Sequence, residues 1–143
     1  MNGPNYRGIF PGLFTMGNVV CGFVALLSVV EGKVTAACWL VILAAFLDSL
    51  DGKVARLSKT TSQFGVELDS LADLTSFGIA PGVILYLSVL RHLGKIGVLI
   101  AAIYAVCAAL RLARFNTILK PDLKNFTGLP TPAAAGVLVS YVL

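Results

Sequence analysis

Five stretches of the chain are almost entirely apolar, and short polar stretches separate them. They lie near residues 11–30, 34–57, 66–90, 95–118 and 130–143. A helix that crosses a bilayer needs about 20 mostly apolar residues, and a spanning segment must satisfy its own backbone hydrogen bonds. The pattern therefore predicts an all-α, polytopic integral membrane helical bundle that forms one transmembrane domain over residues 1–143.

The composition supports this interpretation. Of the 143 residues, 57% are hydrophobic and 13% are charged, whereas soluble domains carry roughly 25% charged residues. The last apolar stretch offers only residues 132–143 after its final proline, which is about 18 Å of helix against a hydrocarbon core of about 30 Å. We expect the chain to be truncated within its fifth helix. The first apolar stretch is expected to be a span and not a cleaved signal peptide, because no soluble body follows it.

The basic residues predict an orientation. If the spans alternate in direction, eight basic residues fall on one side of the membrane and three on the other. The larger group is Arg7, Lys53, Arg56, Lys59, Arg111, Arg114, Lys120 and Lys124, and the smaller group is Lys33, Arg91 and Lys95. Cytoplasmic loops carry the excess of Lys and Arg, so we expect the side with eight to face the cytoplasm.

Five of the seven acidic residues lie within residues 46–78, on that same predicted cytoplasmic side. Asp48 and Asp51 are three apart on the second predicted helix, and Asp69 and Asp73 are four apart on the third. Residues at these spacings share a helix face, and a short polar connection joins the two helices. We therefore expect an antiparallel hairpin that brings four carboxylates together. Burying such charges without partners costs several kcal/mol per ion, as an order of magnitude.

Divalent cations would neutralise this cluster. Mg²⁺ and Mn²⁺ prefer carboxylate and phosphate oxygens, and the absence of a His or Cys cluster in the sequence argues against zinc. Gly52, Ala55 and Gly65 lie on the same predicted faces and leave room for a flat ligand, while Arg56 offers a guanidinium group for phosphate. The window predicts a site with two divalent cations that polarise a phosphoryl group.

The stretch D-S-L-D-G-K-V-A-R-x8-G-V-E-L-D-S-L-A-D resembles the signature of the CDP-alcohol phosphotransferase family, D-x2-D-G-x2-A-R-x8-G-x3-D-x3-D, at all eight fixed positions. The resemblance implies a homodimeric membrane enzyme with a six-helix core, of which about five helices are covered here. It would transfer a phosphoalcohol group from a CDP-linked donor to an alcohol and release CMP. By this resemblance the four aspartates bind two cations, Asp73 is also the general base, and the donor nucleotide pocket includes Gly52, Ala55, Arg56 and Gly65.

Three further stretches, LADLTSFGIAPG, LRLARFN and FTGLPTPAAAG, resemble the phosphatidylserine synthase branch of that family. The branch implies CDP-diacylglycerol as the donor, L-serine as the acceptor, and phosphatidylserine and CMP as products. It would act in a bacterial or archaeal plasma membrane, with its active site on the cytoplasmic side. We expect membrane lipids as further partners and no nucleic acid.

The remaining candidate residues belong to the first, third and fourth predicted helices. A guanidinium group pairs well with a carboxylate such as that of serine, so the acceptor candidates are Arg111 and Arg114, with Asn116 and Ser76. The arginines could instead anchor the helix at the cytoplasmic interface. The additional donor candidates, in the first helix, are Thr15 and Asn18, for which contacts between helices are the alternative.

Two other functions stay open from the sequence. The same family includes enzymes whose acceptor is glycerol-3-phosphate or an inositol phosphate, and a phosphate dianion would require more cationic groups than serine does. A protein of another class, a divalent-cation transporter, could use the same four aspartates as an intramembrane site. The Gly-x2-Ala-Arg spacing has no evident role in such a transporter.

Overall fold

The computed structural model describes residues 9–58, 63–118 and 130–143, and these residues form helices without any strand. The helices are α1 (Ile9–Val30), α2 (Val34–Ser58), α3 (Gln63–Asp73), η2 (Leu74–Ile79), α4 (Ala80–Leu85), η3 (Tyr86–Leu90), η4 (Arg91–Leu93), α5 (Lys95–Ile118) and α6 (Thr131–Val142). The predicted all-α architecture is confirmed. Four of the basic residues used to predict the orientation lie outside the described residues: Arg7, Lys59, Lys120 and Lys124.

Four helical segments of the described chain are long and apolar enough to cross a membrane. They are Gly12–Val30, Val34–Val54, Gln63–Leu93 and Lys95–Thr117. The third begins three residues before the predicted stretch and ends three residues after it, and it includes α3, η2, α4 and η3. Helix α6 is shorter, with 12 residues. The chain is therefore an integral membrane protein with a helical bundle fold.

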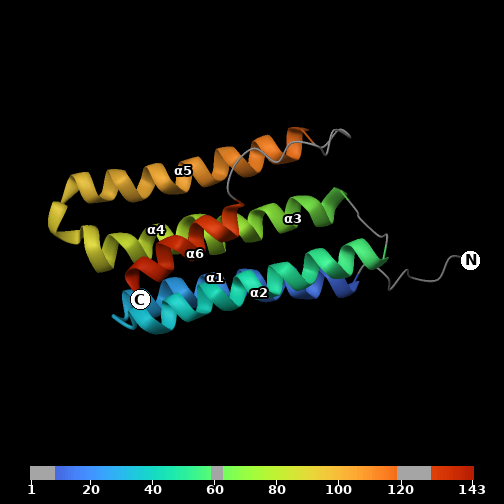
Figure 1. Ribbon diagram of the computed structural model, residues 1–143, viewed down its shortest axis with the longest axis horizontal. Coiled ribbons are helices and arrows are strands. Elements are labelled where there is room, and N and C mark those ends of the chain that lie inside the picture. The colour runs from blue at the N-terminus through green and yellow to red at the C-terminus, as the bar shows by residue number, and fades with distance from the viewer. Residues whose placement is uncertain (1–8, 59–62, 119–129) are drawn as a thin grey trace, which may run out of the picture.

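The third span lies at the centre of the bundle. Helices α1 and α2 run side by side on one flank, α5 lies on the other, and α6 crosses near α2 and α4 (Figure 1). The central segment η2 contacts α1, α2, α5 and α6. Residues carried on the third span can therefore meet residues of almost every other helix.

Two turns at one end of the bundle use glycines with positive φ. Gly32, with φ of 82°, ends α1, and the amide N–H groups of Gly32 and Lys33 donate to the carbonyls of Val29 and Ser28 at 3.0 and 2.8 Å. This pattern is a Schellman motif, which satisfies the last carbonyls of a helix. Gly94, with φ of 57°, lies between the third span and α5. Both turns lie at the end of the bundle away from the start of α3 (Figure 1).

Small residues set the distance between α1 and the third span. A Cβ on Gly22 would lie 2.5 Å from the Oγ and 3.0 Å from the Cα of Ser76. Glycine is therefore required for this approach, as expected where membrane helices pack through small residues. The close contact places the preceding turns of α1 beside the start of η2.

The helical hydrogen-bond pattern changes directly after Asp73. Residues Leu74–Ile79 form a π-helical segment, and the N–H of Ala80 donates to the carbonyl of Thr75. The hydroxyl of Tyr104, on α5, donates to the carbonyl of Phe77 within this segment at 2.9 Å. Single π turns occur frequently at functional sites, and here the turn begins at the last aspartate of the signature.

Candidate active site

Three aspartates meet between α2 and α3. Asp48 comes from α2, and Asp69 and Asp73 come from α3; each offers one carboxylate oxygen, and these three oxygens lie within 4.8 Å of one another. All three side chains are half-buried. Their convergence follows from the sequence, because the spacing of four on α3 keeps Asp69 and Asp73 on one face.

The fourth aspartate, Asp51, is more deeply placed and is not part of this group of three. Its side chain is only 6% exposed. The hydroxyl of Thr15, on α1, donates a hydrogen bond to its Oδ2. Its Oδ1 is buried and has no hydrogen-bond partner among the described residues. Asp51 therefore lies next to the cluster with one carboxylate oxygen engaged and the other unsatisfied.

Helix α1 also contacts the last aspartate of the signature. The Nδ2 of Asn18 donates to Asp73 Oδ1 at 3.1 Å, and the hydroxyl of Ser76 donates to the backbone carbonyl of Asn18 at 2.8 Å. Asn18 is fully buried, and its Oδ1 has no hydrogen-bond partner among the described residues. Two neighbouring polar side chains of α1 thus reach aspartates on two different helices.

This arrangement fits a hard divalent cation. Such ions bind oxygen at about 2.0–2.6 Å, so two ligands of one ion lie at most about 5 Å apart by that geometry, and the three clustered oxygens satisfy this limit. The buried, unsatisfied Oδ1 of Asp51 offers a further oxygen. Within the described part of the chain, a salt bridge joins Lys33 to Glu31, and none involves these aspartates.

The predicted donor residues belong to the same two helices as the aspartates. Gly52 is exposed, and beyond its own stretch of helix no heavy atom of the described residues lies within 4 Å of the position that its Cβ would occupy, so the described surface beside Asp51 is open there. Gly65 is half-buried near the start of α3. Ala55 and Arg56 belong to α2, but their side chains lie outside what the structure describes.

The predicted acceptor residues occupy three different environments. Arg111 is half-buried and Arg114 is exposed, both on the last turns of α5. Ser76 is buried, and its hydroxyl is used in the contact with α1. Asn116 lies beside α3 but does not contact the aspartates in the described structure: its Nδ2 donates to Ser70 Oγ at 2.9 Å.

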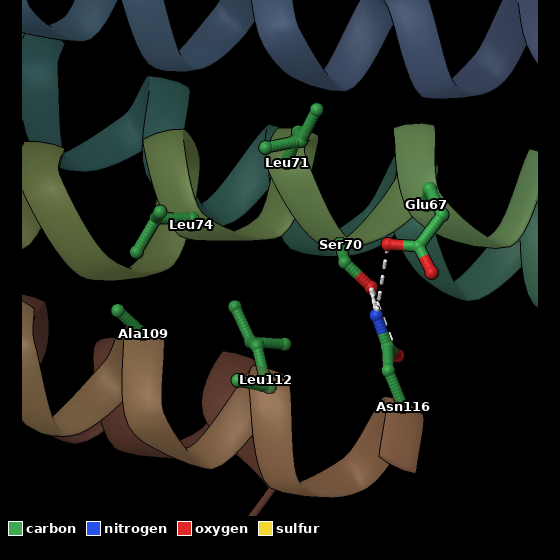
Figure 2. Close-up of a pocket in the computed structure, with 8 residues that line it drawn as sticks. Glu67, Ser70, Leu71, Leu74, Ala109, Leu112 and Asn116 are labelled. Atoms are coloured by element: carbon green, nitrogen blue, oxygen red, sulfur yellow. Dashed lines mark hydrogen bonds between the residues drawn. The ribbon is translucent and has the colours of Figure 1, made fainter.

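Asn116 lies at the polar end of a groove of about 150 Å³ between α3 and α5. Figure 2 shows Asn116 pointing from α5 toward Ser70 and Glu67 of α3, with Leu71, Leu74 and Leu112 further along. A longer hydrogen bond of 3.5 Å joins Asn116 Nδ2 to Glu67 Oε2. The sequence did not single out Ser70, although its position three residues after Glu67 places the two on one helix face.

Comparison with known proteins identifies the family to which this chain belongs. The model of the CDP-alcohol phosphatidyltransferase family matches residues 8–143. The chain belongs to this family, which confirms the family suggested by the signature. The family depends on divalent metal ions, and the acidic cluster provides the oxygen ligands that such ions require.

Curated relatives narrow the comparison. The chain is 44% identical over 136 residues to a CDP-diacylglycerol–serine O-phosphatidyltransferase of Helicobacter pylori, covering 94% of this chain and 57% of that protein. It is 42% identical over 135 residues to an archaetidylserine synthase of Methanothermobacter thermautotrophicus, covering 93% and 57%. It is 40% identical over 129 residues to a CDP-diacylglycerol–serine O-phosphatidyltransferase of Bacillus subtilis, covering 90% of this chain and 72% of that protein. The chain thus spans little more than half the length of the first two relatives.

Proposed function

We propose that this protein transfers the phosphatidyl group from CDP-diacylglycerol to the hydroxyl of L-serine, giving phosphatidylserine and CMP. The observation that carries the proposal is the convergence of Asp48, Asp69 and Asp73 inside the family signature. The serine acceptor is supported by the names of relatives that are 40–44% identical to this chain.

In this proposal, two divalent cations, Mg²⁺ or Mn²⁺, are held by Asp48, Asp51, Asp69 and Asp73. When bound, they supply charge neutralisation and polarise the transferred phosphoryl group. Asp73 also accepts the proton of the serine hydroxyl. Its Oδ1 accepts the Asn18 hydrogen bond, which holds the carboxylate in place. General-base assistance of this kind contributes about 10²–10⁴-fold to the rate.

The substrates approach the cluster from opposite sides in this proposal. The open surface at Gly52 receives the nucleotide of the donor, together with Gly65, Ala55 and Arg56. The half-buried guanidinium group of Arg111 binds the serine carboxylate, with the exposed Arg114 beside it. We give these two arginines priority over Ser76 and Asn116, because the hydroxyl and amide of the latter two are already hydrogen-bonded.

We further propose that the aspartate end of the bundle faces the cytoplasm of a bacterial or archaeal cell and that the enzyme works as a homodimer. The C-terminal turns of α2 and α5, which carry Lys53, Arg111 and Arg114, lie at the same end of the bundle as the start of α3, and the segments between α1 and α2 and between η3 and α5 lie at the opposite end (Figure 1). The latter segments hold Lys33 and Arg91. The positive-inside rule supports this orientation.

The decisive experiment measures CMP release from CDP-diacylglycerol by the purified protein in mixed micelles, with and without L-serine. We expect CMP release to depend on serine, and radiolabelled serine to enter the lipid fraction. Incorporation of glycerol-3-phosphate or an inositol phosphate in place of serine would contradict the proposed acceptor. Mn²⁺ flux into proteoliposomes without any CMP release would contradict the enzyme and support the transporter.

A further inference from the structure

Helix α1 supplies hydrogen-bond donors to the aspartates, although it carries no residue of the signature. Thr15 and Asn18 are three residues apart and therefore share one face of α1. They are 4% and 0% exposed. Thr15 donates to Asp51 of α2, and Asn18 donates to Asp73 of α3. One face of α1 therefore contacts both of the helices that carry the signature.

Both donors engage only one oxygen of their aspartate. Thr15 bonds Oδ2 of Asp51, and Oδ1 of Asp51 stays buried without a partner among the described residues. Asn18 bonds Oδ1 of Asp73, whose carboxylate contributes to the group of three acids. A hydrogen bond to one oxygen fixes the rotation of a carboxylate, so the direction of the second oxygen is fixed as well. Such outer contacts are how proteins orient metal ligands.

A purely structural role explains these contacts poorly. The Oδ1 atoms of Asn18 and Asp51 are both buried and unsatisfied within the described structure, and a buried polar atom without a partner destabilises the fold. Apolar side chains of similar shape would avoid this cost. The polar side chains at these positions therefore need another reason.

We propose that Thr15 and Asn18 are positioning residues, which orient Asp51 and Asp73 so that their second oxygens are ready to bind a divalent cation before any substrate arrives. The inference rests on the proposed cation site and gives Thr15 and Asn18 a different task from the contact with the donor that the sequence suggested. The backbone of Asn18 is itself held, because its carbonyl accepts the hydroxyl of Ser76.

The test compares shape-conserving variants. Thr15→Val and Asn18→Leu remove the donors with little change of volume, and Thr15→Ser keeps the hydroxyl. Mn²⁺ binding is titrated by electron paramagnetic resonance on the purified full chain without substrate. We expect Mn²⁺ affinity to fall about 10–100-fold in Thr15→Val and Asn18→Leu, the range typical of outer contacts of metal ligands, and to be restored in Thr15→Ser. At saturating Mn²⁺, kcat should fall while the KM for CDP-diacylglycerol holds.

Tyr104→Phe is the matched control, because it removes another hydrogen bond between helices, the one to Phe77 of η2, without touching an aspartate. It should keep the Mn²⁺ affinity of the wild type. If Tyr104→Phe loses Mn²⁺ affinity to the same extent, or if all losses follow the melting temperature, the contacts are only structural and the inference is wrong. It is also wrong if the variants bind Mn²⁺ normally and only the donor KM rises.

The inference and the proposed function fail in different ways. The Mn²⁺ titration contains no substrate, so it reports the orientation of the aspartates whatever the acceptor is. A wild-type protein that binds Mn²⁺ but releases no CMP with serine would contradict the proposed function alone. A wild-type protein that releases CMP with serine while Thr15→Val and Asn18→Leu bind Mn²⁺ normally would contradict the inference alone.

Discussion

The four signature aspartates differ in their surroundings. Asp48, Asp69 and Asp73 are half-buried and share one small volume, whereas Asp51 is buried and hydrogen-bonded by Thr15. The sequence predicted that the four would converge, from their spacing on two helices; in the structure three of them form one group and Asp51 lies outside it. It could not predict the unequal burial, which depends on how closely α1 packs against both helices. The partners of Asp51 and Asp73 are 36 and 55 residues away in the chain.

At the scale of the single residue, Asp73→Asn tests the proposed base. The amide cannot take the serine proton and is a weaker ligand, so we expect kcat to fall by about 10²–10⁴-fold or more. Binding of CDP-diacylglycerol should persist. The measurement is serine-dependent CMP release together with the donor Kd.

Glu67→Gln is the matched control, since it makes the same change of charge on an exposed acid of the same helix. It should retain activity. Near-wild-type turnover in Asp73→Asn would remove Asp73 as the base.

Arg111→Ala tests the acceptor site. A charge-assisted hydrogen bond contributes about 1.5–3 kcal/mol, so we expect the KM for serine to rise about 10–100-fold while the donor KM stays constant. Arg91→Ala is the control, because Arg91 lies in η4 at the opposite end of the bundle. If Arg111→Ala and Arg91→Ala have the same KM for serine, Arg111 does not bind the acceptor.

At the scale of the helix, α1 determines how the site is assembled. Gly22 packs against Ser76, and this contact brings Asn18 and Thr15 onto the aspartates. Hydropathy predicted the spans because their length and apolar character are local properties of the sequence. It could not predict the π-helical segment after Asp73, because hydropathy reports the length and apolar character of a span and not which backbone carbonyl each N–H contacts. The contact between Gly22 and Ser76 could not be predicted either, since it joins residues of different spans.

Gly22→Ala tests this packing. Its new Cβ would meet Ser76 Oγ at 2.5 Å, so α1 must move away from η2. Overpacking of this kind costs about 1–3 kcal/mol, and we expect a lower melting temperature and reduced activity in detergent.

Gly12→Ala, on the same helix, is the control, because beyond its own stretch of helix no heavy atom of the described residues lies within 4 Å of its new Cβ. An equal loss in both variants would mean that the effect comes from the helix itself and not from the contact.

At the scale of the whole molecule, the third span organises the bundle. It lies between the pair formed by α1 and α2 and the flanking α5 (Figure 1), and it carries aspartates on one face and the groove with Ser70 and Asn116 on another. The number and order of the spans were predictable. Which helix would be central was not, since hydropathy reports the apolar character of a span and not its neighbours; the central third span has the lowest mean hydropathy of the four, 1.5.

Removal of divalent cations tests the proposed activity as a whole. We expect a chelator such as EDTA to abolish serine-dependent CMP release, and added Mg²⁺ or Mn²⁺ to restore it, because carboxylates that face one another need a counter-charge and the phosphoryl group needs polarisation. The measurement is turnover in mixed micelles as the free cation concentration is varied. Full turnover in EDTA would contradict a cation-dependent mechanism.

The position of the cluster along the chain has a consequence for biosynthesis. All of its acidic residues and both α1 donors lie within residues 15–73, that is, in three consecutive spans that leave the ribosome before α5. A nascent chain therefore already holds every member of the set while α5 is still being translated. Early neutralisation of these acids would ease their release from the translocon into lipid, so insertion efficiency itself should respond to Asp-to-Asn replacements in this segment.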